Sequence, residues 1–307
     1  MKLIRRLIDE ISIIASRILF WRTDRDLARL HAQDSVNWIG KWLIYGARKR
    51  TEREYCAPNT FEERRNSILA KVYSGEGGLH WAKTYLAMPY DWSVVARDGR
   101  YAMLDAALTT CDDGTTALFS GCSSGREVAA YARRYPAHHF LGFDFNDSVV
   151  EFCRDMHEAP NLRFDVLDLT NPNDVSTLVC GDIMFVAGTF VYLTGPALRN
   201  LLDTLPSRIQ MLVIGASVDM GYDYHAEHIS RYKGLFSWSH PYPQLLRQSG
   251  YTYQYTEEAI IYPWAKNISI LACRERLEFE RILDAFFHVR RTQALRVAGG
   301  KEFQALF

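Results

Sequence analysis

The sequence predicts an α/β fold with a mostly parallel β-sheet that is covered by helices on both faces. From residue 114 onward, short apolar segments of strand length alternate with amphipathic segments of helix length. Because neighbouring parallel strands need a crossover connection, this alternation is typical of right-handed βαβ units. The last two apolar segments are joined only by "EAIIYPWAK" (258–266), which favours an antiparallel pair at an edge of the sheet.

Five apolar segments are expected as the first strands of this sheet. They are "TALFS" (116–120), "HFLGFDF" (139–145), "LRFDVLDL" (162–169), "DIMFVAGT" (182–189) and "IQMLVIGAS" (209–217). The helices predicted between them lie at 125–135, 147–157 and near 195–204. The stretch 242–258 predicts a helix, a stop at Gly250 and a strand, and "NISILACRE" (267–275) predicts a final strand.

Three parts of the chain differ in their pattern. Residues 1–104 are predicted as a helical N-terminal region, 105–275 as the α/β domain and 276–307 as a C-terminal helical tail. Within the first part, "WAKTYLAMPYDWS" (81–93) is rich in aromatic residues. Two interpretations stay open for it: a lid that folds over a bound ligand, or an aromatic face that packs on the helices of the sheet.

Charge and cysteine content exclude several classes of function. The 36 Lys and Arg balance the 36 Asp and Glu, but residues 1–65 are basic and residues 110–220 are acidic. An acidic centre argues against a nucleic-acid-binding groove, because phosphate binding needs clustered Lys and Arg. The six cysteines form no C-x-x-C pair, and no histidine completes a zinc-like spacing with them. We therefore expect no metal site, no nucleic-acid partner and a reduced, cytoplasmic setting.

The first 22 residues predict an amphipathic helix. Asp9, Glu10 and Arg17 interrupt the apolar run, so neither a signal peptide nor a membrane span is expected. Apolar residues repeat at helical spacing, with polar residues on the opposite face. The apolar set is Ile4, Leu7, Ile8, Ile11, Ala15 and Ile18, and the polar set is Arg5, Asp9, Ser12 and Ser16. The helix either docks on its own domain or lies in a membrane interface as a peripheral contact.

Small residues crowd the turn after the first strand, in "ALFSGCSSGREVAAYA" (117–132). Open α/β sheets bind ligands at the carboxyl ends of the strands, and the first turn is the usual place. Glycines let a ligand approach the backbone, and the helix that begins near Ser124 offers free N–H groups. The turn residues that we expect at a ligand are Ser120, Gly121, Cys122, Ser123 and Gly125.

Two acidic residues at strand ends indicate that this ligand contains a nucleoside. Asp144 ends the second strand about twenty residues after the glycines, where a carboxylate accepts hydrogen bonds from both ribose hydroxyls. Asp168, just past the third strand, suits a hydrogen bond to the exocyclic amine of adenine, although an N-cap or loop acid is equally expected there. The same predicted site includes Phe145, Leu169, Ala187 and Gly188.

Taken together, these features resemble the class I S-adenosylmethionine-dependent methyltransferases over residues 105–275. The matching pieces are "LFSGCSSG", Asp144, "DVLDL" and "DIMFVAGTFVYL". The resemblance implies S-adenosylmethionine as the cofactor, methyltransferase activity, and a Rossmann-like sheet of seven strands with an antiparallel last strand. Members often have an acid near the end of the first strand, where this chain has Phe119 and Ser120, and a third glycine, where it has Ser123. We expect the hydroxyls of Ser120, Ser123 or Ser124 to bind the cofactor instead.

Three alternatives stay open at this point. The turn is also similar to the A-G-C-S-S-G-E-E motif of the chemotaxis receptor glutamate methyltransferases, which would imply protein-carboxyl methylation. A non-catalytic binding protein that keeps the fold is the second alternative. The third alternative is an NAD-dependent oxidoreductase, which would also use an acid at the position of Asp144. Such enzymes need a G-x-G-x-x-G spacing, which "GCSSG" lacks.

The loop after the fifth strand, residues 217–243, is the predicted place for the acceptor. It is long for a simple connection, and its aromatic residues suit a wall around a sugar ring or another moderately polar small molecule. These aromatic residues are Tyr222, Tyr224, Tyr232, Phe236 and Trp238. His225 and His228 would share a face if the segment is helical, and a hydroxyl acceptor usually needs a base. The candidate catalytic residues are His225, His228 and Tyr192, and the predicted reaction is O-methylation of a small-molecule or glycan hydroxyl, such as that of a lipid-linked sugar.

Overall fold

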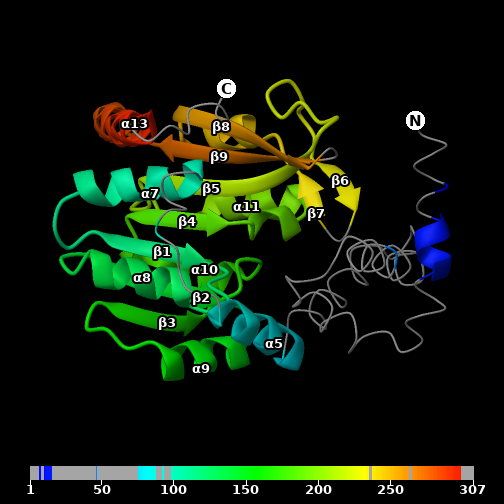
Figure 1. The fold of residues 1–307 in the computed structure, drawn as a ribbon, viewed down its shortest axis with the longest axis horizontal. Coiled ribbons are helices and arrows are strands. Elements are labelled where there is room, and N and C mark those ends of the chain that lie inside the picture. Colours follow the sequence, from blue (N-terminus) through cyan, green and yellow to red (C-terminus); the bar gives the residue numbers. More distant parts are fainter. Residues whose placement is uncertain are drawn as a thin grey trace.

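A seven-stranded β-sheet forms the centre of the computed structural model, which describes residues 7, 10–15, 46, 75–87, 92, 98–234, 237–262 and 265–298. The strand order is β3-β2-β1-β4-β5-β9-β8 (Figure 1). The strands are β1 Thr116–Ser120, β2 His139–Asp144, β3 Leu162–Val166, β4 Ile183–Ala187, β5 Met211–Asp219, β8 Tyr253–Tyr262 and β9 Ala265–Cys273. The predicted fold class is confirmed.

Strands β1 to β5 pair in parallel, and both faces of the sheet are buried. β1 pairs with β2 on one side and with β4 on the other. Successive side chains of β1 point to opposite faces, so Leu118 lies in one core cluster while Ala117 and Phe119 lie in the other. Burial on both faces explains why these strands are nearly continuous apolar runs in the sequence.

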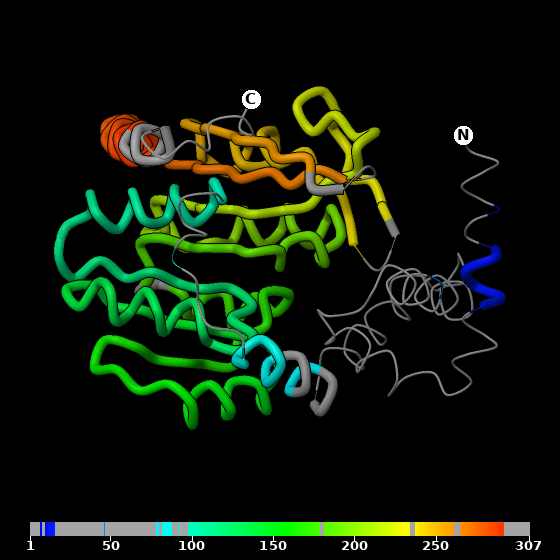
Figure 2. Tube along the Cα trace, in the orientation of Figure 1, coloured from blue at the N-terminus to red at the C-terminus, as the bar shows by residue number. Residues whose placement is uncertain are grey.

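Helices cover the two faces in separate groups. One face carries α7 Gly99–Thr110, α8 Arg126–Arg134, α9 Asp147–Met156 and α13 Arg276–Ala298. The other carries α10 Pro172–Ser176, α11 Gly195–Thr204 and α12 Tyr242–Gln248, together with the short helices η2 Thr177–Cys180 and η3 Phe190–Tyr192. Helix α5, Gly75–Leu86, lies beside α9 at the margin of this layered domain (Figure 2).

The last strand enters the sheet antiparallel, as predicted. β9 pairs with β5 from Met211↔Cys273 to Asp219↔Ala265, and β8 pairs with the other side of β9 at the edge of the sheet. β8 ends at Tyr262 and β9 begins at Ala265, so the chain between them is too short for the crossover that a parallel arrangement would need.

Helices α7 and α13 pack against each other on one face of the sheet. α7 runs across the predicted boundary between residues 104 and 105, and α13 begins the predicted C-terminal tail. Ile282 and Phe286 of α13 are 0% exposed and belong to the same core cluster as Leu104 and Leu108 of α7. The described part of the tail therefore completes the core of the α/β domain.

Residues 217–243 contain more structure than the predicted loop. β6 Arg231–Gly234 and β7 Ser237–Ser239 form a separate two-stranded antiparallel sheet. These strands are too short and polar to give an alternating pattern. The stretch 220–230 holds turns and no helix, so the helical premise that would place His225 and His228 on one face is wrong.

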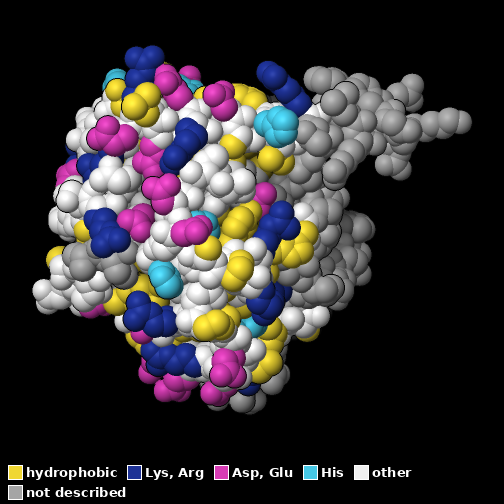
Figure 3. Space-filling view, turned by 90° about the vertical axis from the view of Figure 1, so that its left-hand side faces the viewer, with side chains coloured by type: hydrophobic (Ala, Val, Ile, Leu, Met, Phe, Trp, Pro, Cys, Tyr) yellow, Lys and Arg dark blue, Asp and Glu magenta, His cyan; other side chains and the backbone are white. Residues whose placement is uncertain are grey.

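Positive and negative side chains intermix on the face formed by the amino ends of the parallel strands (Figure 3). Within the described ranges, no helix combines the length and the apolar character that crossing a membrane requires.

Candidate functional site

The carboxyl ends of β1 and β4 lie side by side where the strand order reverses. From β1 the sheet continues through β2 and β3 on one side and through β4 and β5 on the other. Open α/β sheets bind ligands at this kind of switch point. Thr189, which follows β4, donates its hydroxyl to the Ser120 carbonyl at 2.9 Å and ties the two strand ends together.

The turn from β1 to α8 has a left-handed backbone at three of its residues. The φ angles are +64° at Gly121, +49° at Ser123 and +68° at Gly125. Ser123 is the one non-glycine residue with a positive φ in the part of the chain that the structure describes. It stands where the resembled family often has its third glycine, and a side chain in this conformation costs roughly 1–2 kcal/mol.

Two side chains at the end of α9 hold this turn in place, and the sequence analysis missed both. Cys153 Sγ donates to the Ser123 carbonyl at 3.0 Å, and His157 Nε2 donates to the Ser124 carbonyl at 2.8 Å. Burial lowers the pKa of His157, which keeps the ring neutral with its proton on Nε2. Because these partners lie about 30 residues away in sequence, no local pattern signals them.

Gly125 is required by this packing. A Cβ at Gly125 would lie 2.8 Å from His157 Cδ2 and 3.0 Å from both Cys153 Sγ and Phe164 Cε1. Gly121 is similarly close to Thr189, since a Cβ there would lie 2.4 Å from Thr189 Oγ1. Both glycines therefore allow close approach of protein atoms around the turn, in addition to any role at a ligand.

Asp144 reaches the same turn from the end of β2. Its two carboxylate oxygens accept hydrogen bonds from the backbone N–H groups of Ser123 at 3.3 Å and Asn146 at 3.2 Å. Burial raises the pKa of Asp144 from 3.8 to about 6, and the backbone hydrogen bonds offset this in part. The carboxylate is thus ionised near neutral pH, and each oxygen keeps a further lone pair for a ligand hydroxyl.

Two hydroxyls of the strand end and the turn are buried without a partner among the described residues. Ser120 Oγ and Ser123 Oγ make no hydrogen bond to any residue of the described ranges. Leaving a buried hydroxyl unpaired costs about 1–3 kcal/mol, so native structures rarely do so without a reason. Their position at the switch point fits a ligand whose polar groups supply the missing partners.

Phe145 follows Asp144 directly and is 44% exposed. An aromatic ring with one free face, adjacent to a carboxylate, is suited to stack against a flat heterocycle. The structure thus brings together Ser120, Gly121, Cys122, Ser123, Gly125, Asp144 and Phe145 at one end of the sheet.

The loop after β3 lies alongside, because Leu167 N–H donates to the Asp144 carbonyl at 3.0 Å. In this loop the Asp168 carboxylate accepts from the backbone N–H and the hydroxyl of Thr170, both at 2.8 Å. Both hydrogen bonds use Oδ1 and give Asp168 a local turn role, while its contact with adenine stays a prediction. Leu169 is 9% exposed and belongs to the core on the α11 face.

The end of β4 leaves open space. Ala187 is the last strand residue, and Gly188 has a φ of +87°. A Cβ at Gly188 would meet no atom within 4 Å. The Gly188 N–H donates to the Gly215 carbonyl at 2.8 Å, which fixes the backbone at this point. This arrangement agrees with the room that the small pair predicts for a ligand.

The predicted catalytic residues occupy two separate places. Tyr192 is half-buried in η3, shortly after Gly188. His225 and His228 are exposed in the loop after β5. The His225 ring centroid lies 4.3 Å from that of Tyr224, and His228 Nδ1 lies 2.7 Å from Gln244 Oε1 of α12. These partners belong to the loop and to α12 rather than to the β1–α8 turn.

The expected aromatic wall is wrong for two of its members. Tyr222 and Tyr224 are each 1% exposed and belong to the core cluster under α11 and α12. The Tyr222 hydroxyl donates to the Ile229 carbonyl at 3.0 Å. Alternating aromatic and polar residues in a loop do not show which side chains turn inward, so the sequence could not separate core from surface here.

Lys233 is a candidate residue that the sequence analysis missed. β6 places it beside the end of β5, where its ammonium group donates to the Ser217 carbonyl at 2.5 Å. Burial lowers the pKa of Lys233 from 10.5 to about 8, and the nearby Asp219 offsets this in part. Near pH 8 a considerable fraction of this amine is neutral, and a neutral amine can accept a proton. A lysine in a short polar strand carries no sequence signal, so only the contact with β5 reveals it.

Residues Tyr85 and Trp92 of the predicted lid segment lie against α8. Arg126 Nη1 donates to the Tyr85 carbonyl at 3.0 Å, and the Trp92 ring centroid lies 5.2 Å from that of Tyr131. For these two residues the structure agrees with packing on the helices of the sheet. Residues 88–91 and 93 fall outside the described residues.

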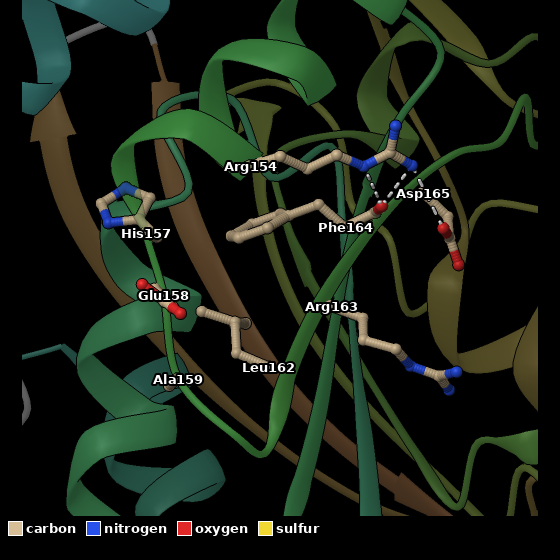
Figure 4. A pocket seen from close by; sticks show the side chains of 8 residues that line it. All are labelled: Arg154, His157, Glu158, Ala159, Leu162, Arg163, Phe164 and Asp165. Atoms are coloured by element: carbon tan, nitrogen blue, oxygen red, sulfur yellow. Dashed lines mark hydrogen bonds and ion pairs between the residues drawn. The ribbon is translucent and has the colours of Figure 1, made fainter.

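A pocket of about 370 Å³ opens at the β3 edge of the sheet, between α9 and β3 (Figure 4). Arg154 spans it and donates to the Phe164 carbonyl at 2.9 Å through Nε and at 2.6 Å through Nη2. His157 lines this pocket and also braces the glycine turn. The pocket lies at the edge strand β3, and two of its lining residues, His157 and Phe164, also pack against the glycine turn at Gly125.

Comparison with known proteins gives a likeness at the level of the fold. No protein-family model and no curated protein matches the chain. Human N-acetylserotonin methyltransferase in complex with SAM is similar with a TM-score of 0.52 and 16% identity, over 77% of this chain and 68% of that chain. The N-terminal domain of EvdMO1 with SAH bound has a TM-score of 0.46 and 16% identity, over 62% of this chain and 84% of that one.

Magnesium protoporphyrin IX methyltransferase from Synechocystis PCC 6803 with bound SAH has a TM-score of 0.45 and 12% identity, over 67% of this chain and 99% of that chain. At such identities the similarity concerns the path of the chain and not the substrate. The strand order with its antiparallel β9 and the likeness to the human enzyme agree with each other. The chain therefore has the Rossmann-like fold of the class I S-adenosylmethionine-dependent methyltransferases, as its sequence predicts.

Proposed function

We propose that the protein is an S-adenosylmethionine-dependent methyltransferase. The observation that carries this proposal is the turn after β1, at the switch point: the Asp144 carboxylate accepts the Ser123 N–H, and the buried hydroxyls of Ser120 and Ser123 have no partner among the described residues. A nucleoside with a polar tail would satisfy all three groups. The turn lacks the G-x-G-x-x-G spacing of NAD sites, which favours S-adenosylmethionine over a dinucleotide.

Different residues at this end of the sheet would bind different parts of the cofactor. Asp144 would accept hydrogen bonds from the ribose hydroxyls, and Phe145 would cover one face of the adenine. The hydroxyls of Ser120 and Ser123 would bind the methionine part, for which the open space at Gly188 leaves room. The remaining predicted contacts are Gly121, Cys122, Gly125, Asp168, Leu169 and Ala187. When bound, S-adenosylmethionine supplies an electrophilic methyl group on a sulfonium.

We further propose that the acceptor is a hydroxyl of a small molecule or glycan and that Lys233 takes up its proton. Its position beside the end of β5 and its pKa of about 8 support this role. Tyr192, which lies in η3 beside β5 and β7, would position the acceptor by a hydrogen bond. His225 and His228 stay candidates for the base, but their exposed places in the outer loop favour them less than Lys233.

Calorimetric titration with S-adenosylhomocysteine and with NAD tests the cofactor. We expect binding of S-adenosylhomocysteine and an about tenfold weaker affinity in a Ser120→Ala/Ser123→Ala variant, because each lost hydrogen bond contributes roughly 0.5–1.5 kcal/mol. The exposed Ser207→Ala substitution is the matched control and should leave the affinity unchanged. Binding of NAD in place of S-adenosylhomocysteine would refute the proposed cofactor.

Methyl transfer from labelled S-adenosylmethionine to candidate acceptors tests the reaction. A methyl ether survives alkaline treatment, whereas the methyl ester expected from the protein-carboxyl alternative releases methanol. For the base, Lys233→Met should lower kcat and remove the rise of kcat with pH near 8, while leaving the affinity for S-adenosylhomocysteine intact. An unchanged pH profile in Lys233→Met would exclude Lys233 as the base. If the wild type binds the cofactor but transfers no methyl group to any acceptor class, the non-catalytic alternative is favoured.

A further inference from the structure

The described part of the N-terminal helix exposes three apolar side chains, of which Leu7 and Ile11 belong to the predicted apolar set and Ile14 does not. Leu7, Ile11 and Ile14 are 60%, 47% and 56% exposed. At about 100° per residue these three side chains fall within roughly 60° of one another around the helix axis. They form one narrow face, which we call the Leu7 face.

The opposite side of the same helix is the buried one. Ser12 is 0% exposed and Ile13 is 4% exposed. A Cβ on Gly46 would lie 2.1 Å from the Ser12 carbonyl oxygen, so this side is in close contact with the residue 46 backbone. The alternative in which the predicted apolar face docks on its own domain is therefore wrong for Leu7 and Ile11, and the predicted polar residue Ser12 is inside.

The sequence segment that carries the Leu7 face is rich in cations. Residues 1–22 contain five Lys and Arg against two Asp and Glu. An exposed apolar stripe in a basic segment is the composition of helices that lie in the interface of an anionic bilayer. No helix of the described ranges could span the membrane, so the contact would be peripheral.

We propose that the Leu7 face docks on the surface of an anionic lipid bilayer. Leu7, Ile11 and Ile14 would enter the boundary between head groups and acyl chains, and the basic side chains of the segment would bind lipid phosphates. In Figure 1 the described helical turn lies on the side toward which the carboxyl ends of β1 and β4 point. The inference does not depend on the proposed methyltransferase activity.

A second copy of the chain is a weaker match for this face. Stable protein interfaces bury about 1,200–2,000 Å² with some 20–30 residues from each partner, and three side chains on one narrow stripe supply far less. The excess of positive charge would also repel an identical segment, whereas it attracts phosphatidylglycerol and similar lipids.

Co-sedimentation of the full chain with phosphatidylcholine vesicles, with and without phosphatidylglycerol, tests the proposal. We expect binding to the anionic vesicles that weakens at high salt. A Leu7→Ser/Ile11→Ser/Ile14→Ser variant should lower the partition coefficient at least about tenfold, because it removes most of the apolar area that enters the bilayer. All three positions are exposed, so the variant should fold like the wild type.

The matched control replaces three other exposed apolar residues, in Ile229→Ser/Ile260→Ser/Leu277→Ser, which are 77%, 71% and 81% exposed. This control should bind vesicles like the wild type. The proposal is overturned if the wild type stays in the supernatant with both kinds of vesicle, or if the two triple variants lose binding equally. It is likewise overturned if light scattering finds a dimer that only the variant of the Leu7 face dissociates.

Discussion

The substitution Asp144→Asn is expected to stabilise the protein without cofactor and to weaken cofactor binding. Burial raises the pKa of Asp144 from 3.8 to about 6. Because the folded-state pKa lies above the unfolded-state value, ionisation of this carboxyl disfavours the folded state. The difference between the two pKa values corresponds to about 3 kcal/mol at pH values above both. Asparagine carries no charge, so the variant avoids this cost. Its NH2 group cannot accept the backbone hydrogen bond of Ser123 or Asn146, which offsets roughly 0.5–1.5 kcal/mol, so the net gain at pH 8 should be about 1–2 kcal/mol.

The dependence on pH gives the sign of the effect. Below about pH 4 the carboxyl is protonated in both states, so no charge penalty separates the two proteins. There Asp144→Asn should be the less stable protein by the one lost backbone hydrogen bond, roughly 0.5–1.5 kcal/mol. Between about pH 4 and 6 the unfolded chain releases the proton first, and the wild type loses stability relative to the variant. Above about pH 6 the gap should stay constant.

Urea-induced unfolding at about pH 4, 6 and 8 measures this gap, with the exposed Asp113→Asn as a control that should show none. Adding S-adenosylhomocysteine at about 100 times its Kd should stabilise the wild type by about 2.7 kcal/mol. The variant should gain much less, because an amide offers one acceptor where the carboxylate offers two. The reasoning is refuted if Asp144→Asn is less stable than the wild type at pH 8, or if S-adenosylhomocysteine stabilises both proteins equally.

Three further predictions concern the glycine turn and α13. Ser123→Gly should raise the free energy of unfolding by up to about 1 kcal/mol in urea titrations, because glycine adopts the φ of +49° without strain; a loss of stability would contradict this. Gly125→Ala should lower the free energy of unfolding by about 2–4 kcal/mol, because its Cβ would meet three side chains within 3.0 Å. Gly188→Ala should lower it by about 1 kcal/mol and mainly weaken S-adenosylhomocysteine binding in calorimetry. Equal losses of stability in the two variants would argue against the packing role of Gly125. Phe286 is 0% exposed, so Phe286→Ala should lower the free energy of unfolding by about 3–5 kcal/mol. Leu277 is 81% exposed, so Leu277→Ala should lower it by less than about 0.5 kcal/mol. A small effect of Phe286→Ala in urea unfolding would mean that α13 does not complete the core.

The sequence was most informative about strands that are buried on both faces and about helices that bury one continuous apolar side. β1 to β5 appear in it as apolar runs because both of their faces are covered, and α11 was expected at the residues where it lies, 195–204. Asp144 was predicted beside the glycine turn from its place at a strand end, and its carboxylate does accept the Ser123 N–H there, because parallel strands bring their carboxyl ends to one edge. The β6–β7 hairpin was missed, since strands of three or four residues give no measurable period.

The sequence by itself determined the order of strands and helices, and with it the end of the sheet where a nucleoside-binding site would form. These follow from local periodicity and from the geometry of parallel crossovers, which act over a few residues at a time. Only the tertiary structure decided which side chains face inward and which partners meet across long separations. Tyr222 is core while Leu7 is exposed, and Cys153 reaches Ser123 from about 30 residues away. The lowered pKa of Lys233 and the buried hydroxyls of the turn were likewise visible only in the tertiary structure. Both depend on burial, which arises from atoms that are distant in the chain and close in space.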